Sequence, residues 1–292
     1  MSTPNDFCVF ILTHGRPDRV LTYDSLKKAG YTGRLYIVID DEDKTEQKYR
    51  ERLGDQVLQF CKADLAKSTD EGDNFNHRKA IVYARNACWD LARQVGCRYF
   101  VQFDDDYTKF HLRFRIPKDG ACEYLTNGRI TSGFDNVIEA LLDFYKQSNA
   151  DSICMAQGGD YIGGYESKTV SLKRKCMNSW FCDVTKPINF VGHMNEDVSA
   201  YVVDGRRGKL FLMVFQVMLT QLQTQATQGG MSDIYLASGT YVKSFYTVMA
   251  APSCTKIGIM GDHRSPHYRI HHQINWHATV PKILNDNCRK RA

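Results

Sequence analysis

The sequence has no long apolar run and no cysteine pair spaced for a metal. Its most apolar stretch, Leu210 to Leu219, is interrupted by Gln216 and is too short to span a bilayer. No basic segment precedes a hydrophobic one near the start, so a secretory signal is not expected. None of the ten cysteines forms a Cys-x-x-Cys pair, which argues against structural zinc. These absences predict a protein of a reducing intracellular compartment, the cytoplasm.

Linkers, repeats and low-complexity segments are also missing. We therefore expect one domain over residues 1–292. The net charge of +5 is modest, but three short basic runs stand out: Lys173-Arg174-Lys175, Arg206-Arg207 and Arg289-Lys290-Arg291. Such runs are common on solvated surfaces; beside an acidic site they could instead hold a polyanion such as nucleic acid.

Strands and helices alternate in the first half of the chain. Apolar runs predict strands over residues 7–12, 34–39, 57–60 and 98–103, and periodic patterns predict helices over 18–29, 44–53 and 76–95. Strands separated by helices of this length predict an α/β, Rossmann-like fold with a mostly parallel, doubly wound sheet.

The second half is less regular. It favours a strand over residues 111–116, a hairpin turn at Lys118-Asp119-Gly120, a helix over 134–146, a strand over 152–156 and a glycine-rich loop over 158–164. The remainder mixes strands and loops, as an elaborated C-terminal half would.

Three consecutive carboxylates, Asp104, Asp105 and Asp106, follow the strand over 98–103. Ionised carboxylates crowded together repel and need a compensating cation. A hard divalent ion such as Mg²⁺ or Mn²⁺ is the usual partner of oxygen ligands. In an open α/β sheet, ligands bind beyond the carboxyl ends of the strands. The run therefore indicates a metal at the mouth of the sheet, the alternative being a solvated acidic turn.

Other polar residues follow neighbouring strands. Thr13, Gly15 and Arg16 form a loop where backbone N–H groups and a guanidinium could approach an anion. Asp40, after the second strand, could take ribose hydroxyls or the edge of a base. On the helix over 76–95, Arg85 could contact a pyrophosphate or ribose, or lie on an exposed face. Together these positions describe a nucleotide lying across the strand ends.

Two further groups could carry chemistry. Glu196 and Asp197 follow Phe190-Val191-Gly192 and are expected to begin a helix or turn. An acid here could deprotonate an acceptor hydroxyl, or serve only as a helix cap. Five histidines gather near the end, and one of them could ligate a metal: His263, His267, His271, His272 and His277.

A strand ending in Asp-x-Asp, a later Glu-Asp and a late histidine resemble glycosyltransferases of the GT-A fold. The closer resemblance is to the phage TET-associated glycosyltransferases, and it spans nearly the whole chain. It rests on five segments in order: Arg174-Lys175-Cys176-Met177-Asn178-Ser179, Asn195-Glu196-Asp197-Val198, Thr224-Gln225-Ala226-Thr227-Gln228-Gly229-Gly230-Met231, Gly239-Thr240-Tyr241-Val242-Lys243-Ser244-Phe245 and Arg269-Ile270-His271-His272.

The resemblance implies that Asp104 contacts the sugar-nucleotide and Asp106 ligates the metal, with His271 or His272 completing the metal site. Asp105 adds a third carboxylate to the simpler Asp-x-Asp pattern, so which pair holds the metal stays open; Asp104 and Asp106 are the expected pair. Asp40 would recognise the nucleotide. The resemblance thus implies a nucleotide-binding half over about 1–110 and an acceptor-binding and catalytic half over about 111–292.

The resemblance also implies that Asp197, with Glu196 beside it, is the base if the transfer inverts the anomeric carbon. Phosphates of the donor or of DNA would bind Arg174, Lys175, Lys243 and Arg269. Aromatic rings could stack on an extruded base, and Tyr161 and Tyr165 in the glycine-rich loop are the ones singled out.

The expected function is a metal-dependent glycosyltransferase with Mn²⁺ or Mg²⁺ and a nucleotide-sugar donor, expected to be a UDP-sugar. It would modify the hydroxymethyl group of a pyrimidine in phage DNA, 5-hydroxymethylcytosine being the expected base. Three alternatives remain: a glycan, protein or small-molecule acceptor; a nucleotidyltransferase, which would release pyrophosphate; and a DNA-binding protein without turnover.

Overall fold

The computed structural model describes residues 4–74, 77–113, 115–118, 121–124, 128–161, 175–222, 242–260 and 269–280. Its strands are β1 (Phe7–Leu12), β2 (Leu35–Asp40), β3 (Val57–Phe60), β4 (Tyr99–Asp104), β5 (Tyr107–Leu112), β6 (Arg115–Lys118), β7 (Ala121–Tyr124), β8 (Gly128–Arg129), β9 (Ser152–Gln157), β10 (Ser179–Asp183), β11 (Phe211–Gln221), β12 (Thr255–Met260) and β13 (Arg269–Ile274). The helices are α1 (Leu21–Lys28), α2 (Glu46–Leu53), α3 (Lys62–Ala66), α4 (Val82–Gln94), α5 (Phe134–Gln147), α6 (Glu196–Arg206) and α8 (Val242–Ala250), with short 3-10 turns η1 (Gly54–Gln56), η2 (Gly158–Tyr161) and η4 (Trp276–Ala278).

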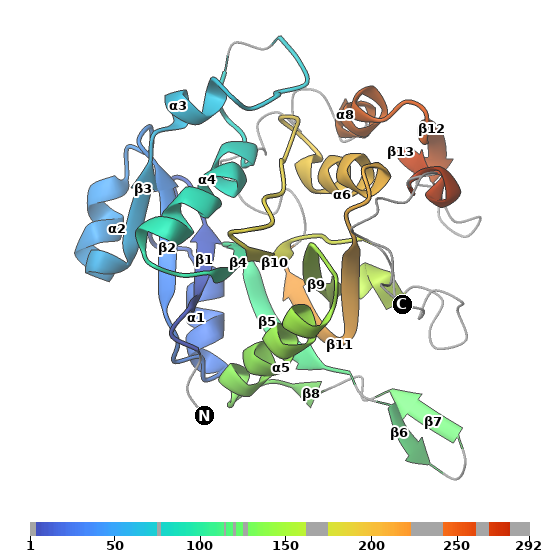
Figure 1. Cartoon of the computed structure of the whole chain (residues 1–292). Helices are drawn as coiled ribbons and strands as arrows, with labels where there is room; N and C mark the ends of the chain where they lie inside the picture. The colour runs from blue at the N-terminus through green and yellow to red at the C-terminus, as the bar shows by residue number, and fades with distance from the viewer. Residues whose placement is uncertain are drawn as a thin grey trace.

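A nine-stranded sheet forms the centre of the molecule, in the order β3-β2-β1-β4-β10-β9-β11-β5-β8 (Figure 1). The first four strands are parallel, as the alternation of strands and helices predicts. Beyond β4 the sheet is mixed, because β10 runs antiparallel to both β4 and β9 while β9 and β11 are parallel. The expected α/β fold is confirmed, with four parallel strands in the first half and its elaboration in the second half.

Both faces of the sheet are covered, which explains why β1 is apolar throughout. Phe7, Val9 and Ile11 pack into one core, and Cys8 and Phe10 pack into the other. Successive side chains of a strand point to opposite faces, so a strand buried on both sides has no polar alternation. Helices α1 and α5 contribute to the first core, and α4 and α6 to the second.

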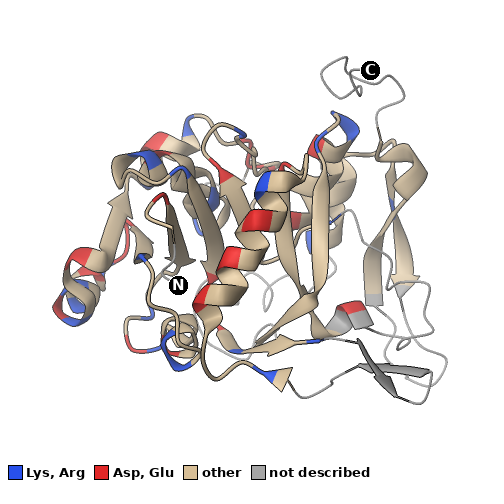
Figure 2. Cartoon of the chain, turned by 60° about the horizontal axis from the view of Figure 1, so that its bottom comes forward, with Lys and Arg blue, Asp and Glu red and all other residues tan. Residues whose placement is uncertain are grey.

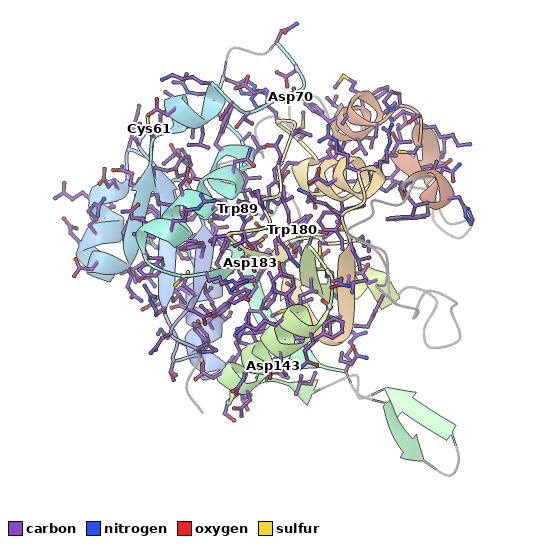
Figure 3. All side chains as sticks on the ribbon, in the orientation of Figure 1. Cys61, Asp70, Trp89, Asp143, Trp180 and Asp183 are labelled. Atoms are coloured by element: carbon purple, nitrogen blue, oxygen red, sulfur yellow. The ribbon has the colours of Figure 1, made fainter. Side chains whose placement is uncertain are left out.

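The second core is centred on aromatic rings. Trp89 and Trp180 lie inside the molecule between the sheet and the helices α4 and α6 (Figure 3). Both contact Phe190, with ring centroids 6.2 Å and 4.8 Å away. Phe190 lies in the segment between β10 and α6, so this packing fixes the path by which the chain reaches the start of α6.

Two helices begin later than predicted. Helix α1 starts at Leu21, not residue 18, because the chain first makes a turn in which Arg19 N–H donates to the Arg16 carbonyl. Helix α4 starts at Val82, not residue 76, after a turn in which Ala80 N–H donates to the Arg78 carbonyl. Both turns lie at the strand-end face, where local hydrogen bonds override helix propensity.

The predicted strand over residues 111–116 is wrong in its bounds. Strand β5 ends at Leu112, and β6 begins a separate two-stranded sheet at Arg115. Strands β6 and β7 form the predicted hairpin, which projects from the body at the lower right of Figure 1; its turn residues lie outside the described ones. Residues 158–161 of the glycine-rich loop form η2, and 162–164 are outside the description.

The last described elements form a small unit beside α6. Helix α8 contacts α6 and both strands of the β12–β13 hairpin, at the upper right of Figure 1. In the part of the chain that the structure describes, no helix has the length and apolar character needed to cross a bilayer.

Candidate active site

The carboxyl ends of β2, β1 and β4 lie side by side, because these strands are parallel neighbours in the sheet. The residues predicted after each of them are therefore brought together. Side-chain alternation then separates the aspartates: Asp104 points toward α4, and Asp105 points toward the loop between β1 and α1.

Asp105 is held by the protein itself. Its carboxylate accepts a hydrogen bond from Thr13 Oγ1 at 2.6 Å and forms an ion pair with Arg16 Nη1 at 3.1 Å. Tyr49 from α2 joins this group, since its hydroxyl lies 3.1 Å from Thr13 Oγ1 and accepts from Arg16 N–H at 2.8 Å. Burial raises the pKa of Asp105, partly offset by Arg16. The middle aspartate thus fixes the β1–α1 loop.

Asp104 is joined to the second acidic element by a buried arginine. Arg85 Nη2 donates to Asp104 Oδ1 at 2.9 Å, and Arg85 Nε donates to Glu196 Oε1 at 2.8 Å. Arg85 is only 2% exposed. Burial disfavours its charge, but Asp104 and Glu196 outweigh that effect and raise the pKa of Arg85. The predicted contact of Arg85 with a nucleotide is not supported by this burial.

One carboxylate oxygen of Asp106 makes no hydrogen bond in the described part of the chain. Its Oδ1 is buried and has no hydrogen-bond partner among the described residues. Burial, followed by repulsion from Asp104 and Asp105, raises the pKa of Asp106 to about 7. Burial, with repulsion from Glu196 and Asp105, likewise raises the pKa of Asp104 to about 6, although Arg85 opposes the shift. Such buried, mutually repelling oxygens are a donor set that fits a hard divalent cation.

The described residues do not include a complete metal-binding group. No three histidine, cysteine, aspartate or glutamate side chains among them are arranged to hold an ion. Asp104 and Asp106 remain neighbours at the strand end, but His271 and His272 are not gathered with them into such a group. The predicted metal site, and the part of the histidines in it, therefore stays a prediction.

Asp40 at the end of β2 is almost fully enclosed. Lys62 Nζ lies 2.8 Å from its Oδ1, and His14 Nδ1 lies 2.7 Å from its Oδ2. Asp40 is 4% and Lys62 is 5% exposed. Burial raises the pKa of Asp40, but the contacts with His14 and Lys62 outweigh it and hold that pKa below its ordinary value. Nearby, Gly15 N–H donates a hydrogen bond to Asp43 Oδ2 at 2.7 Å.

The Asp40–Lys62 pair gives a testable prediction. Lys62→Met is expected to lower the free energy of unfolding by about 3–5 kcal/mol, because it leaves a buried carboxylate without its main cation. Urea unfolding measures this loss. The control is Lys67→Met, which removes an ion pair with Asp64 whose lysine is 76% exposed and should leave the midpoint unchanged. Equal midpoints for both variants would contradict the structural role of Lys62.

Glu196 and Asp197 open α6, as predicted, but their surroundings differ. Glu196 is buried and paired with Arg85. Asp197 is partly exposed, and its Oδ1 accepts from Val198 N–H at 2.7 Å. Burial raises the pKa of Asp197, while Arg85 and Lys243 oppose the rise. Asp197 is therefore the carboxylate of this pair that solvent or a substrate can reach.

The C-terminal unit is tied to the start of α6 through Asn195. The Asn195 side-chain amide donates to Thr247 Oγ1 at 2.8 Å and lies 3.1 Å from His272 Nδ1. His272 is buried, which lowers its pKa to about 4, with His271 and Lys243 adding to the effect. Lys243 is thus close enough to act electrostatically on both Asp197 and His272, near the start of α6.

The residues predicted for nucleic acid are only partly described. Lys175 Nζ forms an ion pair with Asp160 at 2.5 Å, and Lys243 lies in the first turn of α8. Arg174 and Tyr165 lie outside the described residues, as do the side chains of Tyr161 and Arg269. Basic residues are scattered over the described elements rather than gathered in one stripe (Figure 2). The predicted basic surface therefore stays a prediction.

Sequence reasoning missed three residues that organise the site: Tyr49, Lys62 and Asp43. Lys62 follows β3 almost directly, so the strand-end rule applied to that strand would have found it. Tyr49 is the one aromatic residue of α2, whose other residues except Leu53 are polar. Asp43 closes a local turn by accepting hydrogen bonds from the backbone and hydroxyl of Thr45, but its contact with Gly15 depends on the fold of a separate loop.

Comparison with known proteins gives a family and a weaker structural likeness. The family model described as TET-Associated Glycosyltransferase matches residues 7–230. No curated protein matches the sequence. Among solved structures, one that is similar is glucosyl-3-phosphoglycerate synthase from Mycobacterium tuberculosis in complex with Mn²⁺, UDP and phosphoglyceric acid. It is 10% identical, with a TM-score of 0.46, and the match covers 92% of this chain and 86% of that one.

Proposed function

The chain belongs to the TET-associated glycosyltransferase family and is a glycosyltransferase, and from this premise we propose its donor and acceptor. The donor is a nucleotide sugar, UDP-linked, bound with a divalent metal. The acceptor is the hydroxymethyl group of a pyrimidine in DNA, 5-hydroxymethylcytosine in the first place. The observation that carries the proposal is that one buried arginine, Arg85, binds both acidic groups of the site. It pairs with Asp104 of the run Asp104–Asp106 and with Glu196 of the pair Glu196–Asp197.

The donor diphosphate belongs at the ends of β1 and β4. Asp106 has an unsatisfied oxygen, and Asp104 beside it is crowded by like charge, so these two carboxylates would hold the ion. A divalent cation there would neutralise the charge that the departing nucleotide diphosphate gains as the glycosidic bond breaks. Arg16, on the loop that Asp105 anchors, would contact the diphosphate, and Asp40 lies at the nucleoside end of the same face.

The acceptor belongs on the α6 side. Asp197 is the reachable carboxylate there and would accept the proton of the hydroxymethyl group as its oxygen attacks the anomeric carbon. Burial raises the pKa of Asp197, which makes the carboxylate a better proton acceptor than an exposed aspartate. Lys243 and Lys175, with Arg174 and Arg269, would contact DNA phosphates, and Tyr161 and Tyr165 would stack on an extruded base.

The proposed reaction has a direct test. Incubation of the protein and Mn²⁺ with hydroxymethylcytosine DNA and a panel of nucleotide sugars should add one hexose or pentose mass to that nucleoside. Mass spectrometry of the digested DNA measures the gain, and matched DNA with unmodified cytosine is the control. Mass gain on cytosine DNA as well, or on neither DNA with any donor, would contradict the proposed acceptor.

Salt dependence separates DNA from other acceptors. DNA contacts release counterions, so the acceptor KM should rise steeply between 50 and 200 mM salt, by about 10³-fold if some six phosphates are contacted. The donor KM, set by a metal-bound diphosphate inside the site, should change far less. A glycan or small-molecule acceptor would show a nearly flat salt profile.

A further inference from the structure

We propose that Arg85 is a positioning residue that sets the distance and orientation between the donor carboxylate Asp104 and the acceptor-side helix α6. The inference rests on the proposed function, since it assigns donor and acceptor to the two ends of this link. It gives Arg85 a part in the transfer without contact with either substrate.

The geometry of the guanidinium carries the proposal. Its Nε and Nη2 atoms donate to carboxylates that lie 111 and 19 residues away in the chain, Glu196 at 2.8 Å and Asp104 at 2.9 Å. Helix α4 supplies Arg85, β4 supplies Asp104, and α6 begins with Glu196. One side chain thus joins three elements that pack around the same core, with α4 and α6 on one face of the sheet (Figure 1).

Helix α4 is itself anchored at this point. The carbonyl of Arg85 accepts a hydrogen bond from Gln102 Nε2 at 3.0 Å, and Gln102 lies in β4, two residues before Asp104. The guanidinium carbon lies 5.7 Å from the ring centroid of Phe190, on the segment that leads into α6. The position of Arg85 is therefore fixed through both its backbone and its side chain. Arg85 in turn fixes the positions of the two carboxylates that it binds.

Burial distinguishes this arrangement from a ligand contact. With 2% exposure, the guanidinium offers almost no surface to a substrate, whereas Asp104 and Asp197 keep some. Its third nitrogen, Nη1, is buried as well and has no hydrogen-bond partner among the described residues. The other cations of the site contact different acids: Arg16 pairs with Asp105, and Lys62 contacts Asp40 and Glu42 at the end of β2.

The arrangement requires the planar guanidinium of an arginine, whose N–H groups form a rigid fork. Two N–H groups of one rigid plane reach two different carboxylates, and the single ammonium of a lysine cannot reproduce both directions. Loss of the fork would let the start of α6 shift relative to β4. A displacement of about 1 Å between reacting groups lowers turnover by about 100-fold.

The test compares Arg85→Gln and Arg85→Lys with Arg98→Gln. Arg98 pairs with Asp183 at the opposite end of β4, so its loss removes an arginine–aspartate pair far from the site. We expect Arg85→Gln to lower kcat by about 100-fold with a much smaller change in donor KM, and Arg85→Lys to recover part of that loss. Arg98→Gln should match the wild type. A wild-type kcat in Arg85→Lys, or equal losses in kcat and donor affinity for Arg85→Gln, would overturn the proposal.

A second readout does not need turnover. Hydrogen–deuterium exchange at residues 195–199 should be faster in both Arg85 variants than in the wild type and unchanged in Arg98→Gln. If Arg85→Gln does not fold, Arg85→Lys and Glu196→Gln carry both measurements. Wild-type exchange in these variants overturns the positioning role, while absence of sugar transfer by the wild type, with the exchange pattern as expected, contradicts the proposed function alone.

Discussion

Asp106→Asn is expected to lower glycosyl transfer by about 10³-fold while the protein stays folded. Asparagine keeps the size of the side chain but removes the charge that a divalent ion would need, and loss of such electrostatic stabilisation lowers turnover by about 10²–10³-fold. The fold should not suffer, because Asp106 Oδ1 makes no hydrogen bond to any described residue. Transfer assays at saturating Mn²⁺ and urea unfolding measure the two effects.

The pH dependence of stability gives the same variant an independent check. In chelator-treated protein the pKa of Asp106 is raised to about 7, far above the ordinary value of an unfolded aspartate. The folded state thus holds a proton that the unfolded state has lost, so stability falls as pH rises from about 4 to about 7. The slope from this group is at most about 1.4 kcal/mol per pH unit. Asp106→Asn should remove it and be more stable than the wild type at pH 7 and above.

The neighbouring aspartate is the matched comparison. Asp105→Asn weakens the contacts with Thr13 and Arg16 and is expected to lower the urea midpoint, which Asp106→Asn should not do. Near-normal transfer by Asp106→Asn would contradict its assignment to the metal. A lower urea midpoint for Asp106→Asn than for Asp105→Asn would contradict the assignment of Asp105 to the stability of the fold and of Asp106 to the metal.

Asp197→Asn is expected to lower kcat by about 10³-fold with little change in donor KM. A general base contributes about 10²–10⁴-fold to the rate, and its removal leaves the groups that would bind the donor in place. Steady-state kinetics with varied donor at fixed acceptor DNA measure the split. Equal loss of kcat and of donor affinity would make Asp197 a binding residue instead.

The control for Asp197 lies on the same helix. Asp204 is a buried carboxylate near the other end of α6, where Lys209 Nζ contacts it at 2.8 Å. Asp204→Asn should lower stability without changing kcat per folded molecule. If both variants lose turnover in proportion to lost stability, the effect at position 197 is structural and the base lies elsewhere.

Much of the fold could be predicted because its signals are local. The strand Phe7–Leu12 and the helix from Phe134 follow from apolar runs and periodicity within a few residues. The order of these elements then implies parallel strands, and parallel strands bring their carboxyl ends together. Predictions were poorer at boundaries, where residues such as Arg16 and Arg78 make turns that depend on contacts within the loops.

The sequence predicts which residues lie at the site but not which of them form ion pairs with one another. Alternation along β4 sends Asp104 and Asp105 to opposite sides, yet which cation each meets depends on residues elsewhere in the chain. Arg85 was expected to face a nucleotide, and the structure instead buries it between Asp104 and Glu196. Asp40 likewise pairs with Lys62, which lies 22 residues later in the chain, just after β3.

By itself, the sequence determined the α/β order, the family and the acidic residues at the strand ends, since these depend on local patterns and residue type. Only the tertiary structure decided which carboxylates are paired: Asp105 is fixed by Thr13 and Arg16, Glu196 by Arg85, and Asp106 keeps an oxygen without a described partner. The physical reason is that ion pairs form between groups 89 to 111 residues apart in the chain, and their strength depends on burial that no local pattern encodes.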